Sequence, residues 1–242
     1  MNDSEFKRIK NKIFKIDHTR YWGDDYDVRF YLISIIKELK KKRIIDVGGG
    51  VGIISSELDE SNDRINLDLS FEDLKKCKTH SPEINNICAS ITHLPIKENS
   101  IDVVIGASVL EYAKSYDLKN NYQIKKKSTT IYPSIEKTLS NIYQSLKKDG
   151  KFFLTTPNNS YYKSIKLTFA ELKSSISIFN DSKIYFYNTH IKISKNRKLN
   201  MANIIPKLKS KFINSDKIIQ NLVKENTKNN YSVSFFVKAI KN

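Results

Sequence analysis

Four glycines fall within five positions of a chain that has only seven glycines in 242 residues. The stretch "RIIDVGGGVGIISSEL" (43–58) places Gly48, Gly49, Gly50 and Gly52 directly after a short apolar run. Such a run predicts a buried strand, and the residues after the glycines predict a helix. Glycine leaves no Cβ in the way of a ligand, and the start of a helix offers free N–H groups to an anion. The segment therefore predicts a strand–turn–helix unit whose turn receives a ligand.

Segments typical of strands and helices alternate between residues 43 and 157. The expected strands cover 43–47, 64–70, 83–90, 100–110 and 151–157, and the expected helices 27–41, 51–60, 70–78 and 133–150. This alternation predicts an α/β fold with a doubly wound, mostly parallel sheet. Residues 114–130 are polar and predict no element. Two later segments, 183–193 and 231–241, bring the expected strands to seven, and the second, with no helix after it, favours an antiparallel C-terminal strand.

The spacing of the glycines separates two families of cofactor-binding proteins. Nicotinamide and flavin enzymes use G-x-G-x-x-G, but Ile53 stands where the third glycine belongs. The pattern present, D-x-G-x-G-x-G from Asp46 to Gly52, resembles the first motif of the class I S-adenosylmethionine-dependent methyltransferases. Three further segments continue the resemblance: "SITHLPIKENSIDVV" (90–104), "SVLEY" (108–112) and "SLKKDGKFFLTTPN" (145–158). The resemblance spans residues 40–158.

The resemblance implies a Rossmann-like methyltransferase fold and S-adenosylmethionine as the cofactor. The implied cofactor-binding residues are Asp46, Gly48, Gly49, Gly50, Gly52, Asp68, Leu69, Ser90 and Ile91. The glycine turn would receive the methionine end, with its carboxylate on N–H groups at the helix start. Asp46 would brace the turn and reach the α-amino group, and Asp68, 18 residues after Gly50, would accept both ribose hydroxyls. Leu69 and Ile91 would flank adenine.

This chain departs from the family pattern at the adenine. The family's Asp that contacts the adenine amino group aligns with Ser90, whose hydroxyl can accept a hydrogen bond without the charge of a carboxylate. Thr92 and His93 would supplement it. A second departure, Asp149 for the usual Pro before Gly150, is expected to affect only the turn.

The chemistry that the family implies needs little from side chains. Methyl transfer from a sulfonium is an in-line displacement, so the protein mainly has to align donor and acceptor, and a base helps only where the acceptor must lose a proton. No catalytic dyad is visible. The candidates are Glu111 and Tyr112 after the fourth strand, His18 in the N-terminal part and His190 in the C-terminal part. Cys77, Cys88 and the scattered histidines lack metal-ligand spacing, so we expect no metal site.

The net charge of +16 is concentrated at one end of the chain. Residues 183–242 hold 13 Lys or Arg against Asp216 and Glu225, a surplus of +11. Such a surplus suits an acceptor that carries phosphate or carboxylate, for example a lipid- or nucleotide-linked sugar, and it also suits RNA or contact with an anionic membrane surface. A solvated surface without a partner explains the same charge equally well.

The remaining bulk features concern location and domain organisation. No apolar run approaches the roughly 18 residues of a membrane span, and the charged N-terminal segment does not resemble a secretory signal. With two cysteines free to stay reduced, we expect a cytoplasmic protein. We expect a single methyltransferase domain over residues 1–242, with a helical cap (1–40), a cofactor-binding core (41–157) and a basic, substrate-shaping part (158–242).

The predicted function is S-adenosylmethionine-dependent methyl transfer to a small-molecule, sugar or lipid-linked acceptor. The charge favours an RNA methyltransferase as an alternative. However, the fourth strand is followed by "GASVLEY" (106–112) and not by the Asn/Asp-Pro-Pro-Tyr type signature of many base-amino methylases. The replacement at Ser90 and the missing base leave a second alternative, a non-catalytic protein that binds S-adenosylmethionine or acts as a scaffold.

Overall fold

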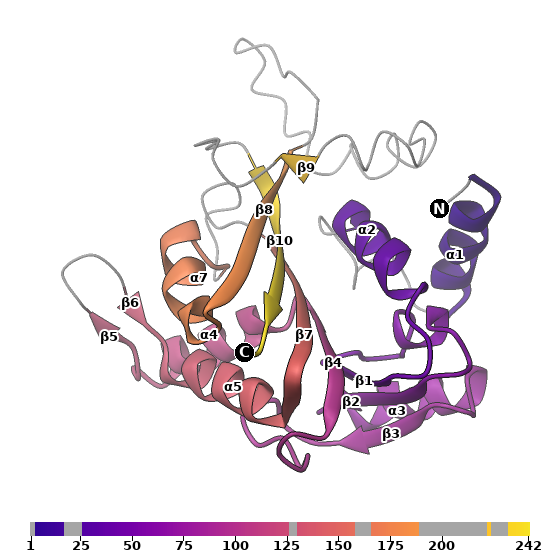
Figure 1. Ribbon diagram of the computed structural model, residues 1–242, viewed down its shortest axis with the longest axis horizontal. Coiled ribbons are helices and arrows are strands. Elements are labelled where there is room, and N and C mark those ends of the chain that lie inside the picture. The colour runs from indigo at the N-terminus through magenta and orange to yellow at the C-terminus, as the bar shows by residue number, and fades with distance from the viewer. Residues whose placement is uncertain (1–2, 17–25, 126–129, 158–165, 189–221, 224–231) are drawn as a thin grey trace, which may run out of the picture.

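The computed structural model describes residues 3–16, 26–125, 130–157, 166–188, 222–223 and 232–242. Within them, an open sheet forms the centre of the molecule, and helices pack on both of its faces (Figure 1). The strand order is β3-β2-β1-β4-β7-β10-β8-β9, and a separate hairpin pairs β5 with β6. The strands are β1 (Arg43–Val47), β2 (Asp63–Asp68), β3 (Asn85–Cys88), β4 (Ile101–Ala107), β5 (Ile124–Lys125), β6 (Thr130–Ile131), β7 (Leu146–Pro157), β8 (Asp181–Asn188), β9 (Leu222–Val223) and β10 (Ser232–Ile240).

The pairing of the strands confirms the predicted fold class. β1 runs parallel to β2 and β4, β2 is parallel to β3, and β4 is parallel to β7. β10 lies antiparallel between β7 and β8, as expected of a final strand that no helix follows. The two-residue strand β9 extends the expected seven strands by pairing with the edge of β8.

Six α-helices surround this sheet in the part of the chain that the structure describes. They are α1 (Asp3–Ile16), α2 (Tyr26–Ile36), α3 (Phe71–His80), α4 (Leu110–Lys119), α5 (Pro133–Ser145) and α7 (Phe169–Ser175), with short 3₁₀ turns η3 (Ser55–Glu57) and η4 (Ile176–Ile178). Local chemistry explains several of their ends. Ser70 caps α3 by accepting a hydrogen bond from the backbone N–H of Asp73, as predicted. Pro133 opens α5, where its missing N–H costs nothing.

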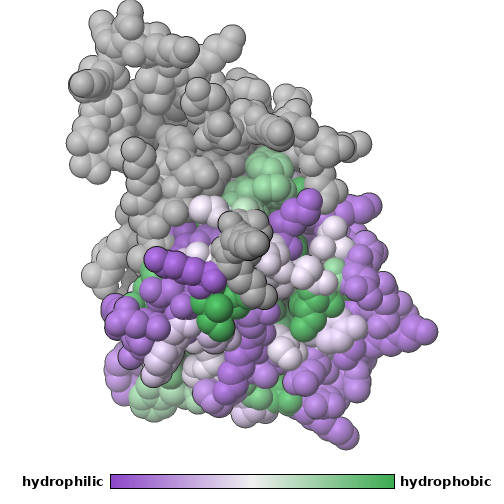
Figure 2. Space-filling view, turned by 90° about the vertical axis from the view of Figure 1, so that its left-hand side faces the viewer, coloured by the Kyte–Doolittle hydropathy of each residue, from purple (hydrophilic) through white to green (hydrophobic). Residues whose placement is uncertain are grey.

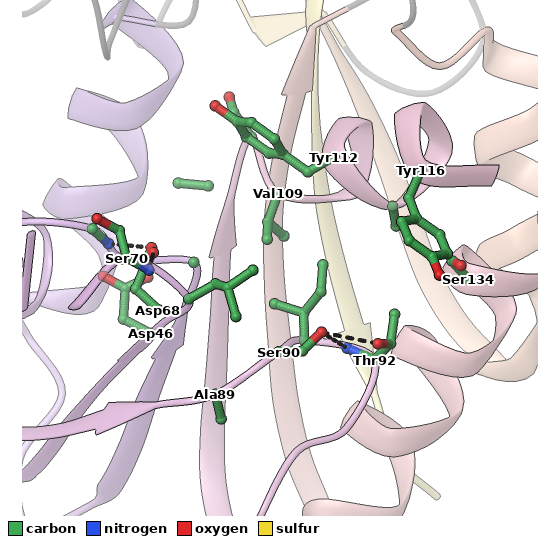
Figure 3. Close-up of a pocket in the computed structure, with 18 of the residues that line it drawn as sticks. Asp46, Asp68, Ser70, Ala89, Ser90, Thr92, Val109, Tyr112, Tyr116 and Ser134 are labelled. Atoms are coloured by element: carbon green, nitrogen blue, oxygen red, sulfur yellow. Dashed lines mark hydrogen bonds between the residues drawn. The ribbon is translucent and has the colours of Figure 1, made fainter. Parts of the chain in front are cut away.

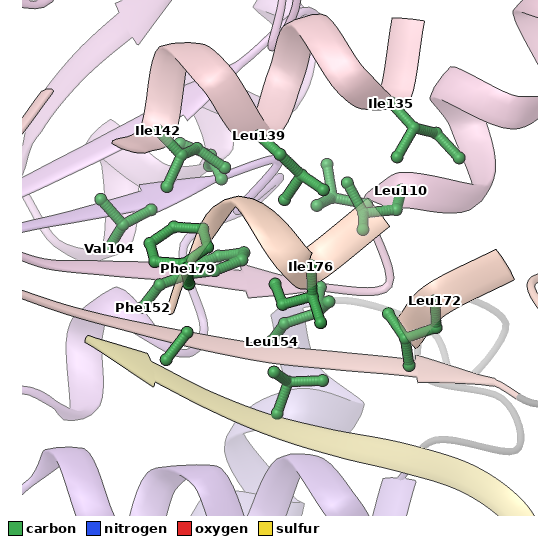
Figure 4. Close-up of a cluster of buried hydrophobic side chains, with 14 of the residues drawn as sticks. Val104, Leu110, Ile135, Leu139, Ile142, Phe152, Leu154, Leu172, Ile176 and Phe179 are labelled. Carbon is green, nitrogen blue, oxygen red and sulfur yellow. The ribbon is translucent and has the colours of Figure 1, made fainter. Parts of the chain in front are cut away.

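The core lies on both faces of the sheet, because neighbouring strand residues point to opposite faces. Ile45 and Phe152 pack into the cluster beneath α4, α5 and α7 (Figure 4), whereas Ile44 and Phe153 pack into the cluster that contains residues of α1 and α2. Both positions of each pair must therefore be apolar. This is why the strands read as continuous apolar runs in the sequence.

The predicted helix over residues 51–60 is wrong. The chain makes a series of turns there and only the 3₁₀ turn η3. Val51, Ile53 and Ile54 are all buried, so the segment does not present one apolar face as an amphipathic helix does. The β-branched residues and serines of this stretch are also weak helix formers. The turns are held instead by α1, from which Arg8 and Lys12 both pair with Glu57.

The polar stretch 114–130, in which the sequence indicated no element, contains the second half of α4 as well as β5 and the start of β6. The strand expected to reach residue 110 ends at Ala107, and α4 follows. The inner face of α4 carries charges, which hid its periodicity: Lys114 and Asp117 are both buried. Lys114 Nζ donates to Glu171 Oε2 of α7 at 2.8 Å, and Asp117 accepts from the backbone and hydroxyl of Ser134 at the start of α5. α7 was likewise not predicted.

Candidate cofactor and active site

A cavity of about 1020 Å³ opens where the carboxyl ends of β1, β2, β3 and β4 meet. In doubly wound sheets this edge is where ligands bind. Figure 3 shows Asp46 and Asp68 on one side of the cavity, Ser90 and Thr92 below, and Tyr116 with Ser134 on the opposite side. The volume lies at the upper end of the roughly 300–1,000 Å³ of small-molecule sites, so the cavity can hold more than one small ligand at a time.

The glycines of the turn serve different purposes. A Cβ on Gly48 would lie 2.5 Å from the Val109 side chain, and one on Gly52 would lie 2.3 Å from Cys77 Sγ. At Gly49 it would lie 2.1 Å from Asn66 Oδ1. These three glycines are therefore required by the packing of the protein itself. Gly48 and Gly49 still line the cavity, whereas Gly52 does not.

Gly50 differs from the other three because its missing side chain faces open space. Its φ is +55°, a left-handed conformation, and the nearest atom to an added Cβ would be Asp68 Oδ2 at 3.9 Å. The Gly50 N–H donates to that oxygen at 2.8 Å, and Asn66 Nδ2 donates to the Gly50 carbonyl at 2.9 Å. The turn is thus fixed by β2 side chains and bare toward the cavity, as expected of a ligand cradle.

Asp68 ends β2, as predicted, and its carboxylate is held by the backbone. Oδ2 accepts from the Gly50 N–H, and Oδ1 accepts from the Ser70 N–H at 2.8 Å. A carboxylate has about four acceptor positions, so both oxygens can still accept from ligand hydroxyls in the cavity. The two backbone bonds fix the direction in which those positions point.

Asp46 is 1% exposed and lines the cavity. Its Oδ2 accepts from the Ser55 hydroxyl at 3.0 Å, while Oδ1 has no hydrogen-bond partner among the described residues. Burial raises the pKa of this carboxyl to about 7, against the lowering effects of Ser55 and of the nearby Arg29 guanidinium. A buried carboxylate oxygen without a donor is costly unless a ligand supplies one. Asp46 therefore fits the ammonium group of an amino acid.

The structure brings the predicted base-contacting residues to one end of the cavity. Leu69, Ser90 and Ile91 all line it, although Leu69 is 73% exposed. The Ser90 and Thr92 hydroxyls lie 2.9 Å apart (Figure 3), and Thr92 Oγ1 lies 3.0 Å from His93 Nδ1. The side chains of Ser90, Thr92 and His93 therefore form a hydrogen-bonded chain at this end of the cavity.

The other end of the cavity is formed by α4, the residues before β5, and α5. Tyr112, Tyr116 and Tyr122 line it and are 71%, 56% and 54% exposed. The rings of Tyr116 and Tyr122 lie 6.1 Å apart in a tilted arrangement. Tyrosine rings offer large apolar surfaces together with a polar group, which suits a second organic molecule.

Of the predicted catalytic candidates, only one lies at the cavity within the described residues. Tyr112 lines the cavity, but Glu111 is buried and is not among the lining residues. His18 and His190 lie outside the described residues.

Sequence reasoning missed several residues of the site. Arg29, Tyr116, Tyr122 and Lys137 all line the cavity. A signal was present for Arg29: it is a charged residue between Val28 and Phe30 on a helix that is otherwise strongly apolar, and all three are buried. The two tyrosines gave no comparable signal: the helix that carries Tyr116 was not predicted, and Tyr122 lies just after it.

The described residues show neither a metal-binding cluster nor a membrane-spanning helix. They contain no group of three or more His, Cys, Asp or Glu side chains placed to hold a metal ion. Among them there is also no helix with the length and apolar character needed to cross a membrane. On the face shown in Figure 2, hydrophilic side chains dominate the described surface, and hydrophobic residues form separate patches between them.

The fold and the site together define a class of protein. A doubly wound sheet with a glycine turn after β1 and a carboxylate at the end of β2 is a Rossmann-like domain for a nucleoside cofactor. Residues 45–154 match the family model described as a methyltransferase domain. This segment of the chain is therefore similar to methyltransferase domains, and the solved structures of similar fold include one determined in complex with S-adenosyl-L-methionine.

Individual relatives agree with this family. The malonyl-[acyl-carrier protein] O-methyltransferase of Hamiltonella defensa is 35% identical over 94 residues, which are 38% of this chain and 36% of the relative. The chain thus spans only about a third of that relative's length.

Solved structures share the fold over most of the chain. A methyltransferase of Thermotoga maritima has a TM-score of 0.57 at 12% identity, covering 97% of this chain and 99% of that one. Phosphoethanolamine N-methyltransferase 2 of Haemonchus contortus, solved with S-adenosylmethionine, has a TM-score of 0.54 at 16% identity, covering 89% of this chain and 52% of that one.

Proposed function

We propose that this chain transfers the methyl group of S-adenosylmethionine to a small-molecule acceptor bound at the tyrosine-lined end of the cavity. The observation that carries the proposal is Gly50, whose left-handed backbone is fixed by β2 and whose missing side chain leaves the cavity open. The size of the cavity supports simultaneous binding of cofactor and acceptor.

The methionine end of the cofactor is a zwitterion, and two neighbouring residues that line the cavity, Asp46 and Arg29, carry charges of opposite sign. Asp46 would accept from the α-amino group through Oδ1. Arg29, which is 8% exposed and lines the same cavity, would bind the carboxylate. This assignment replaces the expected helix start, because η3 is too short to supply a helix N-terminus.

The nucleoside would continue along the ends of β2 and β3. Asp68 would accept from both ribose hydroxyls, in the direction set by its bonds to Gly50 and Ser70. Leu69 and Ile91 would cover the two faces of the base, with Ser90 at its edge.

S-adenosylmethionine, when bound, supplies an activated methyl group that leaves its sulfur by in-line displacement. The residues of the chain hold the two partners in line, and such alignment can lower the barrier by about 7–11 kcal/mol. Tyr112 stands at the first turn of α4 and lines the cavity (Figure 3), so it would cover the reacting centre and exclude water.

The acceptor is proposed as a small organic molecule, among which sugars and lipid-linked compounds are included. Tyr116 and Tyr122 supply the contact surface for it. The cytoplasmic location and the three-part division into cap, core and substrate-shaping part stay predictions.

Calorimetry followed by a transfer assay tests this function. S-adenosylhomocysteine should bind the purified chain at one site, and Gly50→Val should remove that binding. Methyl-labelled S-adenosylmethionine should then label small molecules from a metabolite extract and leave tRNA unlabelled. Absence of cofactor binding in the folded chain would refute the proposal. Labelling of tRNA alone would refute the small-molecule acceptor, and binding without any transfer would refute the catalytic role.

A further inference from the structure

A chain of hydrogen bonds at the base end of the cavity joins Lys137, His93, Thr92 and Ser90. The chemistry of these groups fixes which member donates and which accepts at each step. The hydrogen-bonded chain begins at Lys137 on α5, whose Nζ lies 2.8 Å from His93 Nε2. An ammonium group has only donors, so His93 Nε2 must accept. An imidazole that accepts at Nε2 carries its proton on Nδ1, and the His93 Nδ1–H therefore donates to Thr92 Oγ1 at 3.0 Å.

The direction continues to the cavity. With its oxygen already accepting from His93, Thr92 directs its own O–H to Ser90 Oγ at 2.9 Å, since chained hydrogen bonds strengthen one another when their dipoles align. The backbone N–H of Thr92 also donates to Ser90 Oγ, at 3.3 Å. Both lone pairs of the Ser90 oxygen are then used, and what remains is its proton.

The loop that carries this chain is held against α5 at a second point. Asn141, one helical turn after Lys137, donates through Nδ2 to the Thr92 carbonyl at 2.9 Å. Within the loop, the His93 N–H donates to the Ser90 carbonyl at 3.0 Å. The positions of Ser90, Thr92 and His93 are therefore fixed by backbone bonds as well as by side chains.

We propose that Ser90 presents a hydrogen-bond donor to the base of the cofactor, and that Lys137 sets this polarity through His93 and Thr92. This inference rests on the proposed function, which places the base at Ser90. It reverses the acceptor role that the alignment of Ser90 with an Asp predicts. A donor complements a ring nitrogen or a 6-carbonyl group and does not complement the 6-amino group of adenine.

The consequence is a relaxed choice of base. A carboxylate at this position would accept from the adenine amino group and repel a carbonyl oxygen. With a donor there, the 6-oxo analogue S-inosylhomocysteine should bind within about threefold of S-adenosylhomocysteine. Ser90→Asp should restore an acceptor and favour the adenine compound by about tenfold or more.

Ser90 is the contacting residue, and Thr92 and Lys137 are positioning residues, so their test uses a ratio of affinities. Thr92→Val and Lys137→Met interrupt the chain and free the Ser90 oxygen to accept. The ratio of the two Kd values should then move several-fold toward adenine. A purely structural role would weaken both ligands together and leave the ratio unchanged. Ser100→Ala is the matched control, because the Ser100 hydroxyl donates to the Lys97 carbonyl, and neither residue lines the cavity.

Calorimetry with the two homocysteine compounds decides the matter. The proposal is supported if the full-length chain binds both and if Ser90→Asp, Thr92→Val and Lys137→Met each shift the ratio toward adenine. It is overturned if the unmodified chain rejects S-inosylhomocysteine by about tenfold or more, or if the Thr92 and Lys137 variants leave the ratio unchanged. If neither compound binds, the proposed function fails as well, and that result differs from the selective rejection of one base.

Discussion

The two ends of the cavity are built in different ways. At the β1–β2 end, the backbone N–H of Gly50 donates to the carboxylate of Asp68, and the hydroxyl of Ser55 donates to Asp46. At the α4–α5 end, three exposed tyrosines provide the surface. Backbone bonds define a rigid receptor for one cofactor, whereas exposed rings can adjust to a bound molecule. The difference indicates that substitutions at the first end should alter cofactor binding, and those at the second should alter acceptor binding.

The largest expected effect separates two glycines of the same turn. Gly52→Val should prevent folding, since its side chain would occupy the position of Cys77 Sγ at a residue with φ of +72°. Gly50→Val should fold, with a loss of about 1–3 kcal/mol for the left-handed conformation, yet show no binding of S-adenosylhomocysteine. Thermal unfolding and calorimetry on both variants, with Gly50→Ala as the smaller control, test this difference. Normal cofactor affinity in a folded Gly50→Val protein would contradict the proposed position of the cofactor.

Asp68→Ala should weaken binding of S-adenosylhomocysteine by about 1–3 kcal/mol, because the ribose hydroxyls lose a charged acceptor. The Gly50 and Ser70 N–H groups also lose their partner, so the variant should unfold at a lower temperature. A titration with 2′-deoxy cofactor separates the two effects, since the variant should no longer distinguish it from the ribose compound. Persistent discrimination would show that another residue binds the ribose.

The pH dependence of cofactor binding reports on Asp46. Its folded pKa of about 7 lies above the ordinary 3.8, so the folded state holds this proton more tightly than the unfolded chain. Unliganded stability should therefore fall as pH rises from about 4 to 7. Binding of an ammonium group requires the ionised form, so affinity for S-adenosylhomocysteine should rise about tenfold per pH unit up to pH 7 and then level off.

Two comparisons isolate that effect from other titrating groups. Asp46→Asn should bind the cofactor weakly and without this slope. Methylthioadenosine, which lacks the amino-acid portion, should bind the unmodified protein with little dependence on pH. An equal slope for both ligands would place the titrating group elsewhere.

The smallest expected effects lie at the tyrosine-lined end. Tyr116→Ala and Tyr122→Ala should each remove aromatic contact worth about 0.5–1.5 kcal/mol, raising the KM for the acceptor several-fold. The Kd for S-adenosylhomocysteine should stay within about twofold of the unmodified value. Steady-state kinetics with a labelled acceptor, alongside calorimetry, measures both. A larger loss of cofactor affinity than of acceptor affinity would remove the functional difference between the two ends.

The sequence predicted the elements at the β1–β2 end of the cavity far better than those at the α4–α5 end, for physical reasons. The glycine turn follows the short buried strand β1, and Asp68 ends β2. Close packing and left-handed backbone in the turn allow almost no residue but glycine. The helix α4 escaped prediction because its inner face holds Lys114 and Asp117, each matched by a partner distant in sequence. Such pairings carry no periodic signal, and Tyr116 on that helix was missed with it.

The predicted helix after the glycines failed for the opposite reason. Its residues carry an apolar pattern, but burial on several sides replaces one-sided packing, so periodicity did not decide the local conformation. Similarly, Ser90 lines the cavity, but the polarity that we infer for its hydroxyl is the reverse of the predicted one, since it depends on Lys137, 47 residues further along the chain.

A crystal structure with S-adenosylhomocysteine tests the central claim most directly, namely that the bare turn at Gly50 and the carboxylate of Asp68 receive the cofactor. We expect the ribose hydroxyls to contact Asp68, the amino group to contact Asp46, and the sulfur to face the end of the cavity that Tyr112, Tyr116 and Tyr122 line. Density for the ligand away from the ends of β1 and β2, or a cavity without ligand at saturating concentration, would contradict it.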